Sequence, residues 1–203
     1  MWLIALALMA IAIEYITPAE PPESFPVVDR YARSLIAKSL TRELGREPCP
    51  AELQAIQAVA RHETWYGRGW KQAGVGSNNW GAITAPKCEP EWSFHHGDSA
   101  PDRGKYQACF RRYASPSDGA DALVRTITRR RVAMEDLCNL PTLAAFAGGL
   151  YETKYFAGFG DTVEQRIDTY RGSLEHEVRR ISFELDEPIA FIDVTPGGLA
   201  RGQ

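Results

Sequence analysis

The helix expected between Pro50 and Gly67 carries a carboxylate at a position that should face the core. Its apolar stripe includes Ile56 and Val59, and one further step of seven residues from Ile56 reaches Glu63. Apolar surroundings and the negative end of the helix dipole both disfavour an ionised carboxylate, so both raise its pKa. A carboxylic acid that is still protonated near neutral pH can donate a proton to a glycosidic oxygen. Glu63 is therefore the candidate general acid.

Two other arrangements of Glu63 are open at this point, because its side chain could bend outward or pair with Arg61 or Arg68. The neighbouring sequence favours a sugar-binding cleft, since aromatic faces stack on the apolar faces of sugar rings and amide groups bind hydroxyl and N-acetyl groups. Aromatic, amide and glycine residues crowd the stretch after the helix. Those expected to bind substrate are Trp65, Trp70, Asn78, Asn79, Trp80 and Gly81.

The elements that must position these residues are mostly helical. Apolar residues at helical spacing predict helices over 31–44 and 50–67, from about Ser117, from Pro141 through Phe146, and after a Thr162–Gln165 capping box. Short strands are expected at 83–84 and 105–113, flanking a polar loop, and a strand-like run lies at 189–194. The sequence thus predicts an α+β fold, mainly helical, with a small β-hairpin lobe.

Three regions follow from the composition along the chain. Residues 1–26 form an apolar leader and a Pro-rich linker, residues 27–184 the folded domain and residues 185–203 a tail. The leader, Met1 to Ile13, is too short to span a bilayer comfortably and has no Lys or Arg before it. It reads either as an export signal or anchor, or as a buried helix or assembly contact, so a membrane or assembly contact through residues 1–16 is possible.

Charge and cysteine usage exclude several classes of protein. The net charge of −3 leaves no basic surplus for a polyanion, and the run Arg129 to Arg131 is typical of a solvated helix face, so nucleic acid is not an expected partner. The cysteines form no CxxC pair and have no His at metal-ligand spacing, which argues against zinc and thioredoxin-type sites. Cys88 and Cys109 could close the polar loop as a disulfide, or all cysteines could be reduced. No cofactor is expected.

Four short motifs together resemble glycoside hydrolase family 73, the glucosaminidases. The run Ala58 to Gly67, with Glu63, is similar to the family's helix-borne "xxES-x-x-G", and the run Ser77 to Ile83 to its "x-N-x-(F/W)-G-I" turn. Cys109 to Tyr113 with Ser115 resembles "F-R-x-Y-x-S", and Leu150 to Tyr155 resembles "G-Y-A-T-D-P-x-Y" without its Asp-Pro. The motifs follow the family's order between Glu52 and Leu174.

The resemblance implies a lysozyme-like fold that cleaves the β-1,4 glycan backbone of peptidoglycan as an endo-β-N-acetylglucosaminidase, with Glu63 as general acid. Tyr151 or Tyr155 would be the functional tyrosine. The second carboxylate would lie on the β-lobe, with Asp98 better placed than Glu89 or Glu91, unless the substrate's N-acetyl group assists instead. His95, His96 and Asp98 could bind a metal, although such loop residues are more often solvated, and we expect no metal site.

Other functions on the same fold are muramidase or lytic transglycosylase activity. A protein that kept the sugar-binding groove but lost catalytic turnover could instead be a cell-wall-binding component of an envelope or phage-tail assembly. A peptidoglycan enzyme would be exported to the periplasm or cell wall, or carried in a phage or secretion particle.

Overall fold

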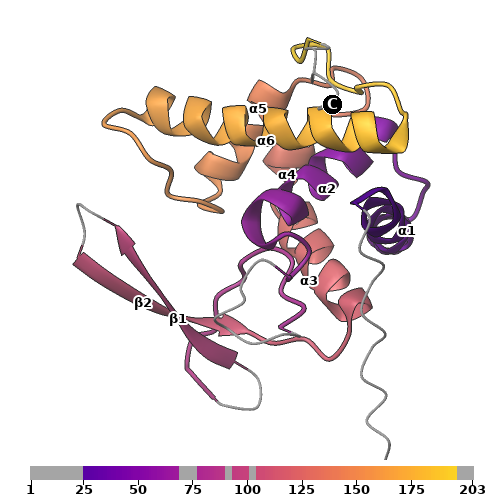
Figure 1. The fold of residues 1–203 in the computed structure, drawn as a ribbon. Helices are drawn as coiled ribbons and strands as arrows, with labels where there is room; N and C mark the ends of the chain where they lie inside the picture. The colour runs from indigo at the N-terminus through magenta and orange to yellow at the C-terminus, as the bar shows by residue number, and fades with distance from the viewer. Residues whose placement is uncertain (1–24, 69–76, 90–92, 101–103, 196–203) are drawn as a thin grey trace, which may run out of the picture.

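The computed structural model describes residues 25–68, 77–89, 93–100 and 104–195. These residues form a helical body from which a β-hairpin projects (Figure 1). The elements are α1 (Phe25–Leu44), α2 (Pro50–Thr64), β1 (Ser93–Ala100), β2 (Gly104–Arg111), α3 (Pro116–Thr128), α4 (Arg131–Met134), α5 (Leu143–Glu152) and α6 (Val163–Leu185). The predicted α+β, mainly helical class is confirmed. Within the described ranges, no helix combines the length and apolar character needed to cross a bilayer.

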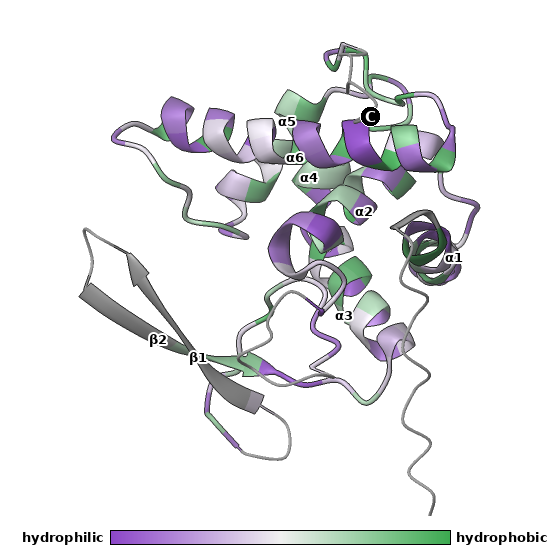
Figure 2. Cartoon of the chain, in the orientation of Figure 1, coloured by the Kyte–Doolittle hydropathy of each residue, from purple (hydrophilic) through white to green (hydrophobic). Residues whose placement is uncertain are grey.

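Helix α2 packs against α1, α3 and α6, which places its apolar stripe at the centre of the body. Ile56 and Val59 on α2 are fully buried, as are Leu174 and Val178 on α6. Figure 2 shows apolar and polar residues interspersed along α3 and α6, as expected for helices that bury one side. Burial of these side chains, at about 1.5–3 kcal/mol for each large one, holds α2 and α6 in fixed register.

The end of α2 turns sharply because three successive residues adopt left-handed backbone angles. The φ angles are 49° at Trp65, 58° at Tyr66 and 77° at Gly67. A Cβ on Gly67 would lie 2.9 Å from the Cα of Asn78, so only glycine lets these two backbones approach this closely. The helix therefore ends at Thr64, earlier than predicted, and residues 77–81 pack against its C-terminal end.

The β-lobe differs from the predicted strand pairing. Strands β1 and β2 are antiparallel, from Ser93 opposite Arg111 to Ala100 opposite Gly104, so β1 lies in the segment predicted to be a loop. The predicted strand at 83–84 forms only an isolated bridge between Thr84 and Phe110. Pro86 follows closely, and a proline has no N–H for a ladder, which explains why this strand stops. Phe110 is thus paired on both edges, by Thr84 and by Phe94.

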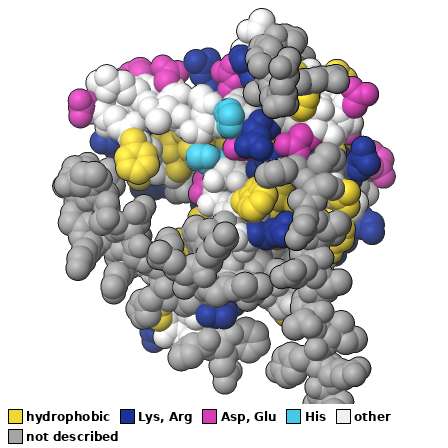
Figure 3. Space-filling view, in the orientation of Figure 1, with side chains coloured by type: hydrophobic (Ala, Val, Ile, Leu, Met, Phe, Trp, Pro, Cys, Tyr) yellow, Lys and Arg dark blue, Asp and Glu magenta, His cyan; other side chains and the backbone are white. Residues whose placement is uncertain are grey.

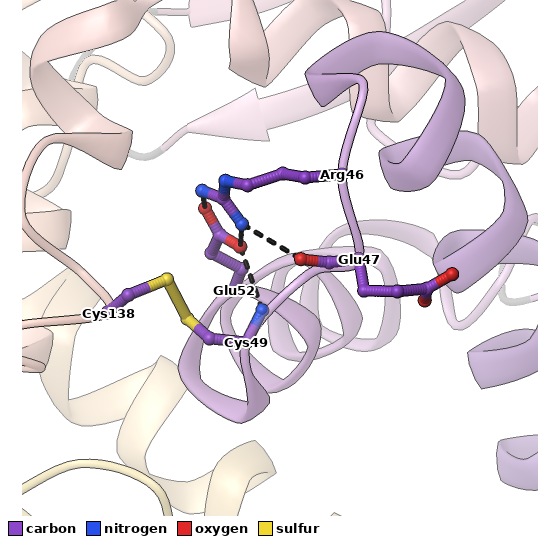
Figure 4. Close-up of a disulfide and its surroundings, with 5 residues drawn as sticks. All are labelled: Arg46, Glu47, Cys49, Glu52 and Cys138. Carbon is purple, nitrogen blue, oxygen red and sulfur yellow. Dashed lines mark hydrogen bonds and ion pairs between the residues drawn. A yellow bond between two sulfur atoms is a disulfide. The ribbon is translucent and has the colours of Figure 1, made fainter.

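Two disulfides tie the described residues together. The predicted Cys88–Cys109 bond is confirmed and fastens the segment before β1 to β2. A second bond, Cys49–Cys138, was not predicted and joins residues 89 apart in sequence, at the start of α2 and after α4 (Figure 4). Beside it, Glu52 accepts hydrogen bonds from the Cys49 N–H at 2.9 Å and from both terminal nitrogens of Arg46, which fixes the first turn of α2.

The predicted strand at 189–194 is wrong, although its apolar residues are buried. The segment is irregular, with Phe191 and Val194 packed against the helices. Its backbone bonds a side chain and a loop. The Gln54 amide donates to the carbonyl of Pro188 at 2.7 Å and accepts from the Ala190 N–H at 2.8 Å, and the Ile192 N–H donates to the carbonyl of Pro141 at 2.9 Å. The side chain of Asp193 accepts from the first N–H groups of α5. This part of the tail therefore belongs to the folded body.

Candidate active site

Glu63 lies in the last turn of α2 and is half-buried against α6. Its Oε1 accepts a hydrogen bond of 2.7 Å from the hydroxyl of Tyr170, a buried residue of α6. Tyr170 is not among the site residues predicted from the sequence. The sequence carries one signal for this bond, a phenol hydroxyl on an otherwise apolar stripe, but only the packing of α2 on α6 shows where that hydroxyl points.

The ionisation of Glu63 suits a proton donor near neutral pH. Burial raises the pKa of its carboxyl to about 7, while the hydrogen bond from Tyr170 opposes this rise because it favours the carboxylate. The direction agrees with the expectation from the apolar stripe. At pH 7 a large share of the Glu63 carboxyl groups therefore holds a proton, whereas an ordinary glutamate would be ionised.

Arg61 and Arg68, the alternative partners of Glu63, have other contacts. The Arg61 guanidinium lies in a buried cluster, 2.6 Å from Asp29, 2.9 Å from Glu177 and 3.0 Å from Glu184. The Arg68 guanidinium lies over the ring of Trp65, 5.3 Å from its centroid.

The cluster around Arg61 joins three helices. Asp29 belongs to α1, Arg61 to α2, and Glu177 and Glu184 to α6. The Tyr66 hydroxyl donates to Asp29 at 2.5 Å and so ties the turn after α2 to α1. Because removing one partner would leave a buried charge uncompensated, this cluster holds α2 in one position on α6 and thereby fixes where Glu63 and Tyr170 meet.

Aromatic rings extend from Tyr170 toward the end of α5. The ring of Phe156 stacks on Tyr170 with centroids 3.8 Å apart, and Tyr151 meets Phe156 edge-on at 5.6 Å. On the other side His62 contacts Tyr170 edge-on at 5.3 Å. Hydrophobic, histidine and acidic side chains meet on this face of the body (Figure 3). The stack fixes the Tyr170 ring and therefore the direction of its bond to Glu63.

The two candidate tyrosines occupy different places. The Tyr155 hydroxyl donates to the carbonyl of Gly81 at 3.0 Å, and burial, with the nearby Glu63 carboxyl as a further cause, raises the pKa of Tyr155 well above its usual value. Tyr155 therefore stays protonated and lies within electrostatic reach of Glu63. Tyr151 contacts Phe156, one ring farther from Tyr170. Of the two candidates, Tyr155 is the one placed within electrostatic reach of Glu63.

One arginine of the run predicted to be a solvated face contacts the site. Arg129 and Arg131 are exposed, but Arg130 is half-buried and its guanidinium lies 5.4 Å from the centroid of the Tyr155 ring. Arg130 also donates to the carbonyl of Thr126 at 2.5 Å. Its contact with Tyr155 adds a cation–π attraction that holds this ring in place.

Most of the predicted sugar ligands in the turn at 77–81 instead contact other residues of the protein. Asn79 is fully buried, and its amide bonds the backbone of Ile83 and Arg111. The amide nitrogen of Asn78 donates to the carbonyl of Tyr113 at 3.0 Å. Trp80 is only 2% exposed and meets Tyr66 edge-on. These side chains hold the turn, and a buried Trp80 ring presents no face on which a sugar could stack.

The remaining predicted ligands are only partly described. Gly81 contributes its carbonyl to Tyr155 and is itself buried, while Trp65 is half-buried beneath Arg68. Trp70 lies outside the described residues. A Cβ on Gly81 would lie 2.6 Å from Leu123 and 3.0 Å from the Tyr155 hydroxyl, so this position allows no larger residue without movement.

The predicted second carboxylate stays a prediction. Asp98 lies on β1 opposite Tyr106 in the hairpin, with only its backbone described, as for His95 and His96. Glu89 is exposed, and Glu91 lies outside the described residues.

Potential metal ligands converge at one place among the described residues, where Cys49, Cys138 and Glu52 lie close together. Both sulfurs there belong to a disulfide and Glu52 binds Arg46, so this group is structural.

The close contact between α3 and the 77–81 turn predicts that one added methyl group on α3 lowers the stability of the protein. A Cβ on Gly119 would lie 1.8 Å from the carbonyl oxygen of Asn78, so Gly119→Ala must displace the turn. We expect a loss of about 3 kcal/mol in the free energy of unfolding, measured by urea denaturation. Gly172→Ala on α6 is the matched control: its Cβ meets nothing within 4 Å, and we expect up to about 1 kcal/mol of stabilisation. Equal effects of the two substitutions would contradict this packing.

The Tyr170–Glu63 bond predicts a shift in pH dependence. Only protonated Glu63 can donate a proton, so any activity should fall as pH rises through its pKa of about 7. Tyr170→Phe removes the bond that favours the carboxylate and should move this alkaline limb of kcat/KM to higher pH. Tyr151→Phe, which leaves the bond in place, should not move it. An unchanged limb in Tyr170→Phe would show that the bond does not control Glu63.

Comparison with known proteins gives a match in fold. The sequence matches no family model and no curated protein sequence. A solved structure shares its fold. It is the catalytic domain of the autolysin Auto from Listeria monocytogenes, with a TM-score of 0.54 over 84% of this chain and 90% of that chain, at 12% sequence identity. At this identity the likeness concerns the fold, and it agrees with the predicted lysozyme-like architecture.

Proposed function

We propose that this chain is a glycoside hydrolase that cleaves the β-1,4 glycan backbone of peptidoglycan, acting as an endo-β-N-acetylglucosaminidase with Glu63 as general acid. The observation that carries the proposal is the Glu63 carboxyl, held by Tyr170 at the end of α2 with a pKa raised to about 7. Its motifs resemble those of glycoside hydrolase family 73, and its fold is similar to that of an autolysin catalytic domain.

The proposed mechanism uses the proton on Glu63. The carboxylic acid donates it to the glycosidic oxygen as the bond from that oxygen to the anomeric carbon breaks, and positive charge develops on the sugar ring. Glu63, now a carboxylate, accepts a proton from the water that adds to the anomeric carbon. The charge on the ring is stabilised either by a second carboxylate, for which Asp98 remains the candidate, or by the substrate's own N-acetyl group.

Tyr155 has a supporting role in this proposal. Its hydroxyl holds the Gly81 carbonyl, and its ring lies under Arg130 within electrostatic reach of Glu63. The neutral phenol adds no negative charge beside the carboxyl, so Glu63 keeps its proton more readily than it would next to another anion. We therefore assign Tyr155 to shaping the site around Glu63.

The proposed location is outside the reducing cytosol. Disulfides persist in oxidising compartments, and the structure has two, Cys49–Cys138 and Cys88–Cys109. Export to the periplasm or cell wall, or transport in a phage or secretion particle, would give access to peptidoglycan. Residues 1–16, the proposed membrane or assembly contact, lie outside the described residues.

The proposal is tested by digesting purified sacculi and identifying the new sugar ends by mass spectrometry. A glucosaminidase leaves reducing N-acetylglucosamine, a muramidase leaves reducing N-acetylmuramic acid, and a lytic transglycosylase leaves an anhydro sugar. Reducing N-acetylglucosamine, absent with Glu63→Gln, is the expected result. Either of the other ends would correct the specificity while keeping Glu63. Binding to sacculi without any new ends would favour a non-catalytic cell-wall-binding component.

A further inference from the structure

A groove of about 590 Å³ lies between the end of α5 and the first turns of α6. Its apolar lining comes from Tyr151, Phe156 and Ile167, and its charged lining from Glu152, Lys154 and Arg166. Phe156 also stacks on Tyr170, whose hydroxyl bonds Glu63, with ring centroids 3.8 Å apart. The groove therefore lies next to the candidate active site, although the proposed proton transfer makes no use of it.

Exposed apolar side chains lie on the groove and on the loop before α6. Val163, which lines the groove, is 48% exposed, and Phe159 of the loop is 70% exposed. The loop that carries Phe159 is fastened to α6, because the Arg166 Nε donates to the carbonyl of Gly160 at 2.9 Å and a Cβ on Gly158 would lie 2.6 Å from the Arg166 Cβ. The groove is thus preformed, which lowers the entropic cost of binding a ligand there.

The charges of the groove favour an acidic ligand. Lys154 is exposed and Arg166 half-exposed, against the single acid Glu152. The Arg166 Nε is used by the loop, and its terminal nitrogens have the fork geometry that binds carboxylates. An amine on the ligand could pair with Glu152. The lining therefore suits a short peptide that carries carboxylates, an amine and small apolar side chains.

We propose that this groove binds the acidic stem peptide that hangs from each N-acetylmuramic acid of the glycan strand. The inference rests on the proposed function, because it assumes a peptidoglycan strand at Glu63. The bond that a glucosaminidase cleaves joins N-acetylglucosamine to N-acetylmuramic acid, and the N-acetylmuramic acid carries the stem peptide. A glycan strand bound at Glu63 therefore brings a stem peptide close to the neighbouring groove. Its carboxylates meet Lys154 and Arg166, and its methyl groups meet Phe156 and Ile167.

The test measures binding to the full-length Glu63→Gln protein by calorimetry, so that no turnover interferes. The probes are two soluble tetrasaccharides of alternating N-acetylglucosamine and N-acetylmuramic acid, one with stem peptides and one without. We expect about tenfold tighter binding of the peptide-bearing probe, and a smaller preference in 0.5 M NaCl because partly exposed charges are screened.

Charge reversal tests whether the preference for the peptide-bearing probe depends on the basic residues of the groove. Adding Lys154→Glu and Arg166→Glu should abolish it, while Arg166→Lys, which keeps the charge, should retain most of it. The matched control reverses two exposed charges on α1, Arg30→Glu and Lys38→Glu, and should leave the preference intact. Thermal melts check that each variant is folded.

The outcomes separate this inference from the proposed function. Equal binding of both probes, or a preference that survives the double reversal in the groove, would overturn the stem-peptide site. Cleavage of sacculi without a peptide preference would overturn the groove alone. A preference that depends on Lys154 and Arg166 in a protein that cleaves nothing would support the groove and overturn the hydrolase.

Discussion

Glu63→Gln is expected to lower kcat/KM on sacculi by about 10³-fold, the usual contribution of a general acid. Glutamine has nearly the same shape as glutamate and can still accept the hydrogen bond from the Tyr170 hydroxyl, so α2 and α6 should pack as before. What it lacks is a proton that can be donated. The measurement is the initial rate of release of soluble fragments from sacculi.

Two controls make the result specific to proton donation. Glu135→Gln neutralises an exposed glutamate at the end of α4 and should keep full activity. Binding of Glu63→Gln to sacculi should match that of the unchanged protein, because the side chain keeps its volume. Equal rates for the Glu63→Gln and Glu135→Gln variants would remove Glu63 from the chemistry.

Loss of the Cys49–Cys138 bond should give the largest change in stability. In the chain-entropy description, a disulfide that closes a loop of 89 residues stabilises the fold by about 4–5 kcal/mol. The double substitution Cys49→Ala and Cys138→Ala should therefore lower the free energy of unfolding by that amount in guanidinium titrations without reductant. The bond also fixes the start of α2, so its loss should let this helix fray beside Glu52.

The second disulfide is the internal comparison. Cys88–Cys109 spans 21 residues, which the same description values at about 3 kcal/mol. It lies at the base of the β-lobe, so its removal should loosen the hairpin more than the helical body. A larger loss for the Cys88–Cys109 pair than for Cys49–Cys138 would contradict the view that the longer bond holds the body together.

The sequence predicted those features of the site that arise within one element. Glu63 follows Ile56 and Val59 by helical periodicity, so its burial could be inferred from α2 alone. The Thr162 and Gln165 side chains form the predicted capping box at the start of α6. The polar segment between Cys88 and Cys109 indicated a closed loop, and the disulfide confirms it.

Features that depend on contacts between distant segments could not be predicted. Tyr170 meets Glu63 across 107 residues, and no local pattern distinguishes its hydroxyl from that of another tyrosine. Asn79 was predicted to bind sugar because a sequence does not show whether a side-chain amide faces solvent or bonds the backbone. In the structure the Asn79 amide donates hydrogen bonds to the carbonyls of Ile83 and Arg111. The sequence of β1 predicts a loop because its polar residues give no alternation of apolar side chains.

The most direct test of the central claim is the titration of the Glu63 side chain itself. Carbon NMR of protein labelled at the glutamate carboxyls, recorded from pH 3 to 9 and compared with Glu63→Gln, assigns the one resonance that the substitution removes. We predict that this resonance titrates with a pKa of about 7. A midpoint near the ordinary value of 4.5 would mean that Glu63 is ionised at neutral pH and cannot serve as the acid.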